Sequence, residues 1–286
     1  MQRLREHAPL VFLGALCIVT AFIWQSAFAK TPGKLTVAFL NVGQGDSIYI
    51  EGPDGTQLLV DGGPDRTVLS RLGSIMPLAD RSIDVVIATH PDQDHISGLV
   101  DVLSLYDVHY VFEPGIGKDT NAYKALEHVV AEKQIPRILA RRGMRIPLGG
   151  GAEFRILFPD RDIESDDTND DSIVAEVRYG KTCFLLTGDA PTKTVESYIL
   201  YVLKDEHLRC DVLKLGHHGS SGSSGIAFLS AVSPAAAVVS AGKGNRYGHP
   251  APDVLARVAS LDIPLLSTID EGTIVFESDG KVIRER

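Results

Sequence analysis

The chain has 286 residues, 44% of them hydrophobic, with 27 glycines and a formal net charge of −9. This length and composition are typical of a globular α/β protein with one large domain or two small ones and many tight turns. The acidic balance argues against a wide electrostatic footprint for nucleic acid, which normally needs a basic face. It does not exclude a nuclease whose metal ions contact the phosphate, because acidic side chains are what hold such ions.

The first 29 residues are predicted to lie outside the fold. Two arginines precede an apolar run over residues 10–24, and an Ala-x-Ala cleavage signature ends at Ala29. We expect either a signal peptide cleaved after Ala29 or an uncleaved membrane anchor, because residues 10–29 are just long enough to span a bilayer. Both interpretations place the domain formed by residues 34–286 outside the cytoplasm, as a secreted or periplasmic protein or as one anchored to the membrane.

From residue 35 on, apolar runs separated by Gly-, Pro- and Asp-containing turns predict a regular series of strands and helices. Strands are expected over residues 35–40, 47–51, 57–61, 84–88, 108–112, 154–158, 172–179, 182–186, 212–215, 236–240 and 273–276. Helices are expected over residues 66–75, 98–105, 121–133, 192–203 and 252–260. Strands followed by helices recur in two halves. This order favours an α/β fold with a four-layer αββα sandwich of two mixed sheets over a doubly wound single sheet.

Two further features of the body carry little functional weight. The acidic loop over residues 159–171 is expected to be solvated and mobile. Cys183 and Cys210 fall at strand-like positions, where a disulfide is conceivable but two buried free thiols are the commoner case.

The most informative stretch is the hexamer His90-Pro-Asp-Gln-Asp-His95, which follows the apolar run over residues 84–88. Imidazole and carboxylate ligands on a short loop after a strand suit Zn²⁺ or Mn²⁺ and leave room for a bound water. An acidic turn with incidental histidines and an exposed ion-pair cluster are the alternatives. The position of the hexamer at the end of a buried type of strand argues against both.

Polar residues also gather at the ends of other expected strands or in nearby loops. They are Asp46 and Ser47, Asp61, Asn169 and Ser172, Asp189, His217, His218 and Ser220, and His249. Clusters that recur at strand ends point to one shared edge where these loops meet.

This ordered set of motifs resembles the metallo-β-lactamase superfamily, and within it the soluble hydrolase domain of ComEC-type competence proteins, which take up DNA. The resemblance rests on residues 39–47, 89–95, 169–172, 186–189, 213–220 and 247–250. It implies an αββα sandwich with metal ions in a cleft at one edge. It covers a hydrolase domain and does not extend to transport.

Two positions depart from the usual pattern of the superfamily. Asp92 stands where its metal loop usually has a second histidine, and Asn169 lies near the place of another missing histidine. The ComEC-type subgroup shares both changes. Carboxylate and amide oxygens make the site harder, which weakens the preference for Zn²⁺ and favours Mn²⁺ or Mg²⁺.

The expected cofactors are two divalent ions, Zn²⁺ or Mn²⁺ with Mg²⁺ as a further option, and Asp189 is placed to bridge them. Of His217 and His218, one is expected to be a ligand and the other a donor to phosphate; we assign His217 to the metal and His218 to catalysis, although the sequence does not distinguish them. The expected metal ligands are His90, Asp92, Asp94, His95, Asp189 and His217.

The remaining candidates have catalytic, substrate-binding or supporting roles. Asp94 is expected to orient a water as well as bind metal, and His249 to close the site or bind substrate. Asp46, Ser47 and Asp61 are expected to shape the metal loop through hydrogen bonds. The candidates for contact with substrate or with a metal-bound water are Asn169, Ser172 and Ser220.

The function expected from these residues and the resemblance is a metal-dependent phosphodiesterase, a nuclease acting on DNA outside the cytoplasmic membrane in a competence-related role. The alternatives are a metallo-hydrolase of a small lactone, thioester or phosphoester, and a non-catalytic binding module. The expected partners are a phosphodiester substrate, DNA among the possibilities, and a membrane contacted through the N-terminal segment. The sequence indicates no protein partner.

Overall fold

The computed structural model describes residue 16 and residues 33–162, 165–204 and 208–286. The predicted leader, residues 1–29, falls outside the described residues apart from Leu16. Within the described ranges, no helix is long and apolar enough to cross a membrane. The two interpretations of the leader therefore stay predictions.

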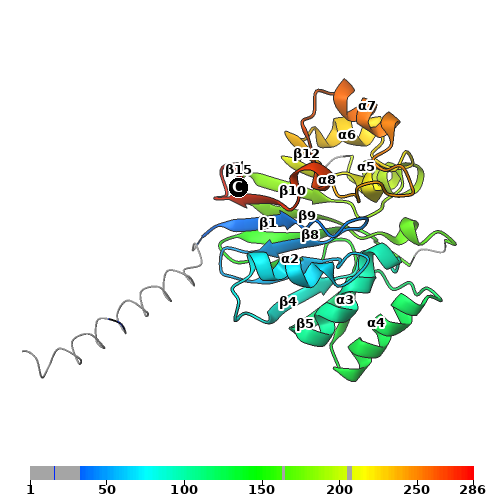
Figure 1. The fold of residues 1–286 in the computed structure, drawn as a ribbon. Helices are drawn as coiled ribbons and strands as arrows, with labels where there is room; N and C mark the ends of the chain where they lie inside the picture. The colour runs from blue at the N-terminus through cyan, green and yellow to red at the C-terminus, as the bar shows by residue number, and fades with distance from the viewer. Residues whose placement is uncertain (1–15, 17–32, 163–164, 205–207) are drawn as a thin grey trace, which may run out of the picture.

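The described residues form two mixed β-sheets packed face to face (Figure 1). The first sheet has eight strands, in the order β15 (Ile283–Glu285), β14 (Ile274–Ser278), β1 (Leu35–Phe39), β2 (Ile48–Glu51), β3 (Gln57–Val60), β4 (Ser82–Ile87), β5 (Asp107–Glu113) and β6 (Arg137–Leu139). The second has seven, in the order β13 (Leu265–Ser267), β12 (Ala236–Val239), β11 (Val212–Lys214), β10 (Thr182–Leu186), β9 (Val174–Tyr179), β8 (Ala152–Phe158) and β7 (Arg145–Pro147).

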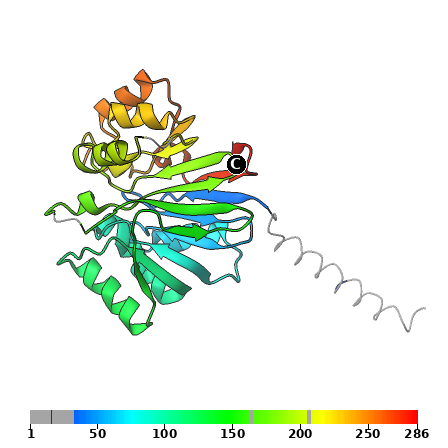
Figure 2. The same ribbon diagram turned by 180° about the vertical axis from the view of Figure 1, so that it is seen from behind.

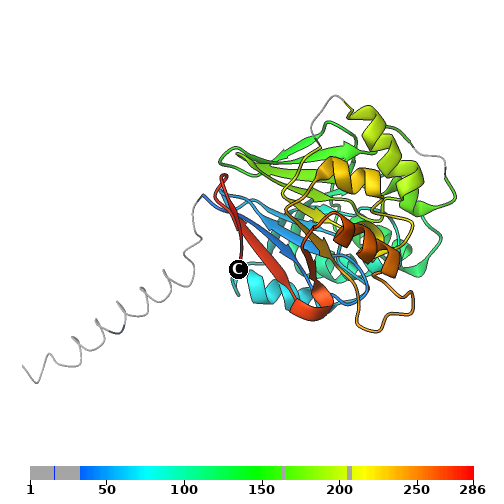
Figure 3. The same ribbon diagram turned by 90° about the horizontal axis from the view of Figure 1, so that it is seen from above.

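Helices cover the outer faces of both sheets, as the view from behind in Figure 2 also shows. The first sheet carries α2 (Thr67–Ile75), α3 (Gln93–Leu105) and α4 (Asn121–Glu132). The second carries α5 (Ser197–Val202), α6 (Ile226–Val232) and α7 (Pro252–Ser260), and the short α8 (Thr268–Glu271) follows β13. From above, the C-terminal hairpin in red lies beside β1 in blue (Figure 3). The expected αββα sandwich is confirmed.

The central strands of both sheets are buried on both faces, which explains their nearly continuous apolar sequences, whereas the edge strands are partly exposed. In β1, Leu35, Val37 and Phe39 face the core between the sheets. Ala38, between them, faces the core under α2 and α3 because side chains alternate along a strand. A third core lies between the second sheet and its helices. With both faces covered, only strand ends and loops are left to carry chemistry.

Parallel strands bring the functional loops to one edge. β3 and β4 run parallel in the first sheet, and β10, β11 and β12 run parallel in the second. The loops that leave the carboxyl ends of parallel strands lie next to each other. The segments after these five strands start at Asp61, Ala88, Thr187, Leu215 and Ser240.

Most expected elements are confirmed, with differences at a few boundaries. The helix expected at residue 98 begins at Gln93, so Asp94 and His95 lie in its first turn rather than in a loop. The helix expected over 192–203 is a π-helix, Thr192–Glu196, followed by α5. Short or weakly patterned elements were missed: β6, β7, β13, β15, α6 and α8.

Two expectations about the body need correction. Cys183 and Cys210 form a disulfide, with Cα atoms 4.6 Å apart, rather than two free thiols. The acidic loop is not solvated throughout, because its last residues form a 3₁₀-helix, Thr168–Asp171, in which Thr168 and Asp171 are buried. Residues 163–164 lie outside the described part of the chain.

Candidate metal centre

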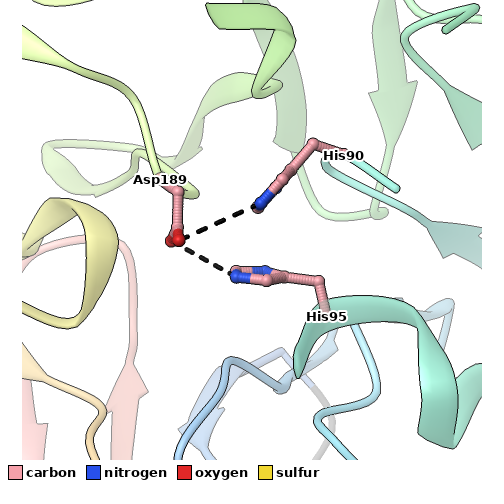
Figure 4. A group of neighbouring side chains, drawn as sticks. All are labelled: His90, His95 and Asp189. Carbon is pink, nitrogen blue, oxygen red and sulfur yellow. Dashed lines mark ion pairs between the residues drawn. The ribbon is translucent and has the colours of Figure 1, made fainter. Parts of the chain in front are cut away.

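Side chains from both sheets converge at the shared edge. Figure 4 shows His90 and His95, from the first sheet and α3, pointing at Asp189 from the loop after β10. His90 Nε2 is 3.9 Å from Asp189 Oδ2, and His95 Nε2 is 3.3 Å from Asp189 Oδ1. His218, from the turn after β11, places its Nε2 3.5 Å from Asp189 Oδ2. We call His90, His95, Asp189 and His218 the floor of the site; all four are buried.

The metal loop is held by close backbone packing. At Gly98 in α3, a Cβ atom would lie 2.0 Å from the Gly62 carbonyl oxygen, so only glycine lets the helix approach this closely. At Gly45, a Cβ atom would lie 2.2 Å from the Asp94 carbonyl oxygen. The turn before β2 therefore packs directly onto the first turn of α3, and Asp46 N donates to the same Asp94 oxygen at 3.2 Å.

Asp61 fixes the protonation of His90 and His95. Its carboxylate accepts from His95 Nδ1 at 2.7 Å and from Thr89 Oγ1 at 2.7 Å. Since the single Thr89 hydroxyl hydrogen goes to Asp61, the 3.0 Å contact between Thr89 Oγ1 and His90 requires His90 Nδ1 to donate. Both histidines therefore carry a hydrogen on Nδ1 and present Nε2 to the floor. Ser47 lies behind this network, where its hydroxyl donates to the Asp61 carbonyl at 3.0 Å.

His218 is oriented in the same way. Its Nδ1 lies 3.0 Å from the Ser240 carbonyl oxygen, which can only accept, so the hydrogen is again on Nδ1. Asp46 Oδ1 lies 3.2 Å from the same nitrogen and adds a negative charge beside it. His217 and His218 both adopt left-handed backbone conformations, with φ values of 50° and 53°. This turn directs His218 inward and leaves the His217 side chain 32% exposed.

The floor fits a divalent metal ion. Among the described residues, several buried side-chain atoms have no hydrogen-bond partner, which is costly unless another ligand satisfies them. In the floor these atoms are His90 Nε2, His95 Nε2, Asp189 Oδ1 and His218 Nε2. Ligand atoms of His90, His95 and Asp189 lie within 4.8 Å of one another, and so do those of Asp94, His95 and His218. Nitrogen and carboxylate oxygen together form a donor set for Zn²⁺ or Mn²⁺.

The electrostatics of the floor are those of a cation site. Burial alone would raise the pKa of Asp189, but the surrounding histidines, His218 first, lower that pKa well below its usual value. Burial and the neighbouring His95 lower the pKa of His90 to about 3. Burial opposes the charging of His218, yet Asp189 and a second carboxylate raise its pKa to about 9. The charge of Asp189 is thus balanced mainly by neighbouring imidazoles, and a bound metal ion would take over that role.

Asp92, the residue just before α3, pairs with a cation. Its carboxylate is 2.6 Å from Lys118 Nζ and also accepts from the Thr168 hydroxyl. No group of possible metal ligands in the described residues includes Asp92, whereas Asp94 belongs to one with His95 and His218. The expectation that Asp92 binds metal stays a prediction. A lysine already balances its charge.

Both paired histidines lie close to Asp189, so the assignment of His217 to the metal and of His218 to catalysis stays a prediction. His218 is buried and belongs to the floor, while His217 is partly exposed and has its Nε2 3.6 Å from Asp189 Oδ2. The ring centroids of His217 and His249 are 5.6 Å apart, and the His249 ring stacks with Tyr247 at 5.7 Å. His249 is therefore a neighbour of His217 at the entrance and not a member of the floor.

The three polar candidates lie in different surroundings. Ser172 Oγ accepts from the Asp189 backbone N–H at 3.2 Å and so supports the loop that carries this carboxylate. Asn169 Oδ1 is a buried oxygen without a hydrogen-bond partner in the described residues. Ser220 Oγ accepts from the Gly222 backbone at 3.4 Å and lies in the turn after His218.

A cavity of about 740 Å³ opens beside the floor. Asp92 and Asp94 line it together with two cations, Lys118 and Arg246, and with the half-exposed ring of Tyr247. We call Asp92, Asp94, His217, His249, Lys118, Arg246 and Tyr247 the rim of the site. Lys118 and Arg246 carry no separate signal in the sequence, since single cations on loops have no pattern that marks them.

The chain is similar to known proteins in sequence and in fold. Residues 40–243 match the family model described as the Metallo-beta-lactamase superfamily. The chain is 28% identical to ComE operon protein 3 of Bacillus subtilis (strain 168), over 97% of the chain and 37% of that protein. It is 31% identical to Competence protein ComA of Neisseria gonorrhoeae, over 92% of the chain and 35% of that protein. The chain thus spans little more than a third of these relatives.

A solved structure extends the likeness in fold. Tm1679, a metal-dependent hydrolase of the beta-lactamase superfamily, superposes with a TM-score of 0.54 at 14% sequence identity. The match covers 84% of this chain and 98% of that chain. At this identity the likeness concerns the fold alone.

Proposed function

The chain belongs to the metallo-beta-lactamase superfamily, and from that premise we propose that it is a phosphodiesterase that cleaves DNA outside the cytoplasmic membrane. Because it belongs to this superfamily and has a buried His/Asp floor, the protein is a metal-dependent hydrolase related to competence proteins. We propose in addition that its substrate is a phosphodiester.

The observation that carries the proposal is the pairing of a buried ligand cluster with a cavity lined by two cations as well as two carboxylates. Lys118 and Arg246 line the same cavity as Asp92 and Asp94. Each linkage of a DNA strand brings one negative charge, and a site with several carboxylates accepts it only if cations offset the repulsion. A neutral lactone or thioester has no use for these cations. The cavity is therefore better suited to an anionic chain than to a small neutral ester.

The floor residues would hold the metal ions. Asp189 turns its two oxygens to different histidines, Oδ1 to His95 and Oδ2 to His90 and His218, so each oxygen would hold metal together with an imidazole. Bound there, the ions would supply Lewis-acid polarisation of a phosphoryl oxygen and an acidified water. The assay below compares Zn²⁺, Mn²⁺ and Mg²⁺. Three imidazoles suit Zn²⁺ or Mn²⁺ better than Mg²⁺.

The rim residues would handle the substrate and its protons. Asp94 lies between floor and cavity, with its side chain 31% exposed and its Oδ2 3.2 Å from His218 Nε2. It can accept the proton of an attacking water in this position. His249 has a buried Nδ1 without a hydrogen-bond partner among the described residues, so it can bond to a substrate oxygen. Lys118 and Arg246 would contact phosphates on either side of the scissile linkage.

The proposed location rests on the disulfide and on the relatives. The Cys183–Cys210 bridge favours an oxidising compartment, where disulfides persist. The similar proteins from Bacillus subtilis and Neisseria gonorrhoeae are competence proteins, which supports a competence-related role. Attachment to a membrane through residues 10–29 is part of the proposal, and those residues lie outside the described ones except for Leu16.

The test is an assay of the purified protein on single-stranded DNA and on bis-p-nitrophenyl phosphate with Mn²⁺, Zn²⁺ or Mg²⁺. We expect metal-dependent cleavage of both, and a loss of about 10²-fold or more in Asp94→Ala. Asp101→Ala is the matched control, because Asp101 lies on the same helix, 3.9 Å from Arg66 and away from the floor. Activity on the small diester without cleavage of DNA would overturn the nuclease proposal.

A further inference from the structure

We propose that a buried ion pair behind the floor, Lys214 with Asp46, sets the charge that the metal ion meets. The inference rests on the proposed metal site but not on its substrate. The Lys214–Asp46 pair acts as a neutral unit. Breaking it from either side should change metal affinity in opposite directions.

Both partners lie fully inside the protein. Lys214 is the last residue of β11 and has no exposed surface, and Asp46, in the turn before β2, is 2% exposed. Lys214 Nζ is 2.7 Å from Asp46 Oδ2 and donates to the Leu215 carbonyl at 2.8 Å. A lysine is almost never fully buried unless it is paired. The sequence alone suggests no role for Lys214, whereas its burial and its pairing with Asp46 suggest an electrostatic one.

The pair connects directly to the floor. The other oxygen of Asp46, Oδ1, lies 3.2 Å from His218 Nδ1, and His218 Nε2 is 3.5 Å from Asp189 Oδ2. A continuous line of charged or polar groups thus runs from Lys214 to Asp189. Asp46 Oδ1 has no geometrically sound hydrogen bond within the described residues, because the His218 hydrogen points to the Ser240 carbonyl. The influence of Asp46 on His218 is therefore mainly electrostatic.

Stability alone does not account for such a pair. The cost of removing two charges from water often exceeds their attraction, so an apolar pair of similar size would serve the fold as well or better. Near a divalent ion, however, each charge has a specific effect. An unpaired Asp46 anion would attract the ion and an unpaired Lys214 cation would repel it, and the low local dielectric strengthens both effects. Together they add no net charge.

The experiment compares metal affinity in the full chain for Asp46→Asn, Lys214→Met and the double variant, by competition with a chromogenic chelator for Mn²⁺ and Zn²⁺. Outer-shell partners typically change metal affinity by about 10- to 100-fold. We expect affinity to fall by that order in Asp46→Asn, to rise by about tenfold in Lys214→Met, and to return to within a few-fold of the wild type in the double variant.

Glu176→Gln is the matched control. Glu176 is also a buried carboxylate, 2.9 Å from Arg178 and 3.4 Å from Arg155, but it lies in β9 and contacts no floor residue in the ion pairs that the structure records. The Glu176→Gln variant should have a lower free energy of unfolding but an unchanged metal affinity. A purely structural role for Lys214 and Asp46 predicts the same result for them as for Glu176. Affinity changes of the same sign in both single variants, or none, would overturn the inference.

Two outcomes separate this inference from the proposed function. If the wild type binds neither Mn²⁺ nor Zn²⁺, the metal site and the inference fail together. If it binds metal but the variants lack the opposite signs, only the inference fails.

A single variant that does not fold still gives an answer through metal rescue. Added Mn²⁺ should restore a cooperative thermal transition to Lys214→Met, whose unpaired anion the metal can balance, but not to Asp46→Asn. Rescue of both, of neither, or of Asp46→Asn alone would contradict the proposal.

Discussion

The floor and the rim of the site are built in different ways. In the floor, every histidine has its Nδ1 fixed by an acceptor on the protein, so each Nε2 points inward. In the rim, charged side chains are partly exposed and bond to one another, as Lys118 does to Asp92. Arg246 likewise bonds to the hydroxyl of its neighbour Tyr247 at 2.6 Å.

This difference separates two parts of the function. A buried cluster with fixed hydrogens can hold a cation but has little freedom to adapt to different substrates. A rim whose ion pairs are exposed loses little when it exchanges them, because surface pairs are weak. We therefore expect floor substitutions to act on metal binding and rim substitutions to act on the substrate.

The largest effect is expected from the floor. His95→Ala should remove most bound metal and reduce hydrolysis by about 10³-fold, the upper end of the loss seen when one electrostatic stabiliser of a transition state is removed. Metal analysis of the purified variant, together with its rate on bis-p-nitrophenyl phosphate, checks this. Full metal content in His95→Ala would contradict the assignment of metal binding to the floor.

A smaller effect is expected at the boundary between the two regions. Asp94→Asn should lower kcat by about 10²-fold, because the proton acceptor is lost. The variant should still retain a metal ion held by His90, His95 and Asp189, whose side chains are unchanged. The measurement is kcat alongside metal content. An unchanged kcat would mean that Asp94 takes no part in proton transfer.

In the rim, the substrate rather than the metal should be affected. Arg246→Ala should raise KM for a single-stranded oligonucleotide by up to about tenfold and reduce the salt dependence of binding by about one unit of slope. Its kcat for the small diester should stay the same. Arg66→Ala, at a side chain that is 74% exposed outside the rim, is the control. Equal changes in both variants would show that Arg246 contributes no more to substrate binding than an exposed arginine outside the rim.

The smallest effect concerns Asp171, which lies between the two regions. It is in the short helix with Thr168, which bonds to Asp92, and it precedes Ser172, which bonds to Asp189. Burial and the neighbouring Asp170 raise the pKa of Asp171 to about 6. Its stabilising contribution is therefore complete below its unfolded value, near 4, and is lost as pH rises through about 6.

Asp171→Asn should consequently raise Tm by a few degrees at pH 7.5 and by less at pH 4.5. Thermal unfolding at the two pH values measures this. A gain that is the same at both values would assign the effect to something other than the ionisation of Asp171.

The sequence predicted the fold well because strand and helix patterns depend on local periodicity. It also located the edge of the site, since polar residues at strand ends gather wherever parallel strands end together. It did not show which way a side chain turns there. The left-handed backbone of His217 and His218 decides which of them enters the floor, and nothing in a His-His pair indicates it.

Long-range pairings escaped prediction for a related reason. Lys118 meets Asp92, and Lys214 meets Asp46, across large separations in the chain. The disulfide between Cys183 and Cys210 depends on the parallel pairing of β10 and β11, which a single sequence does not specify. Only the arrangement of the two sheets brings these partners together.

The most direct test of the central claim is a crystal of the protein soaked in Mn²⁺ and measured at a wavelength where manganese scatters anomalously. The account predicts a peak within about 2.0–2.3 Å of His90 Nε2, His95 Nε2 and an oxygen of Asp189. A second peak near Asp94 and His218 would agree with two ions. No peak in the floor, or a peak only at the rim near Asp92, would contradict the account.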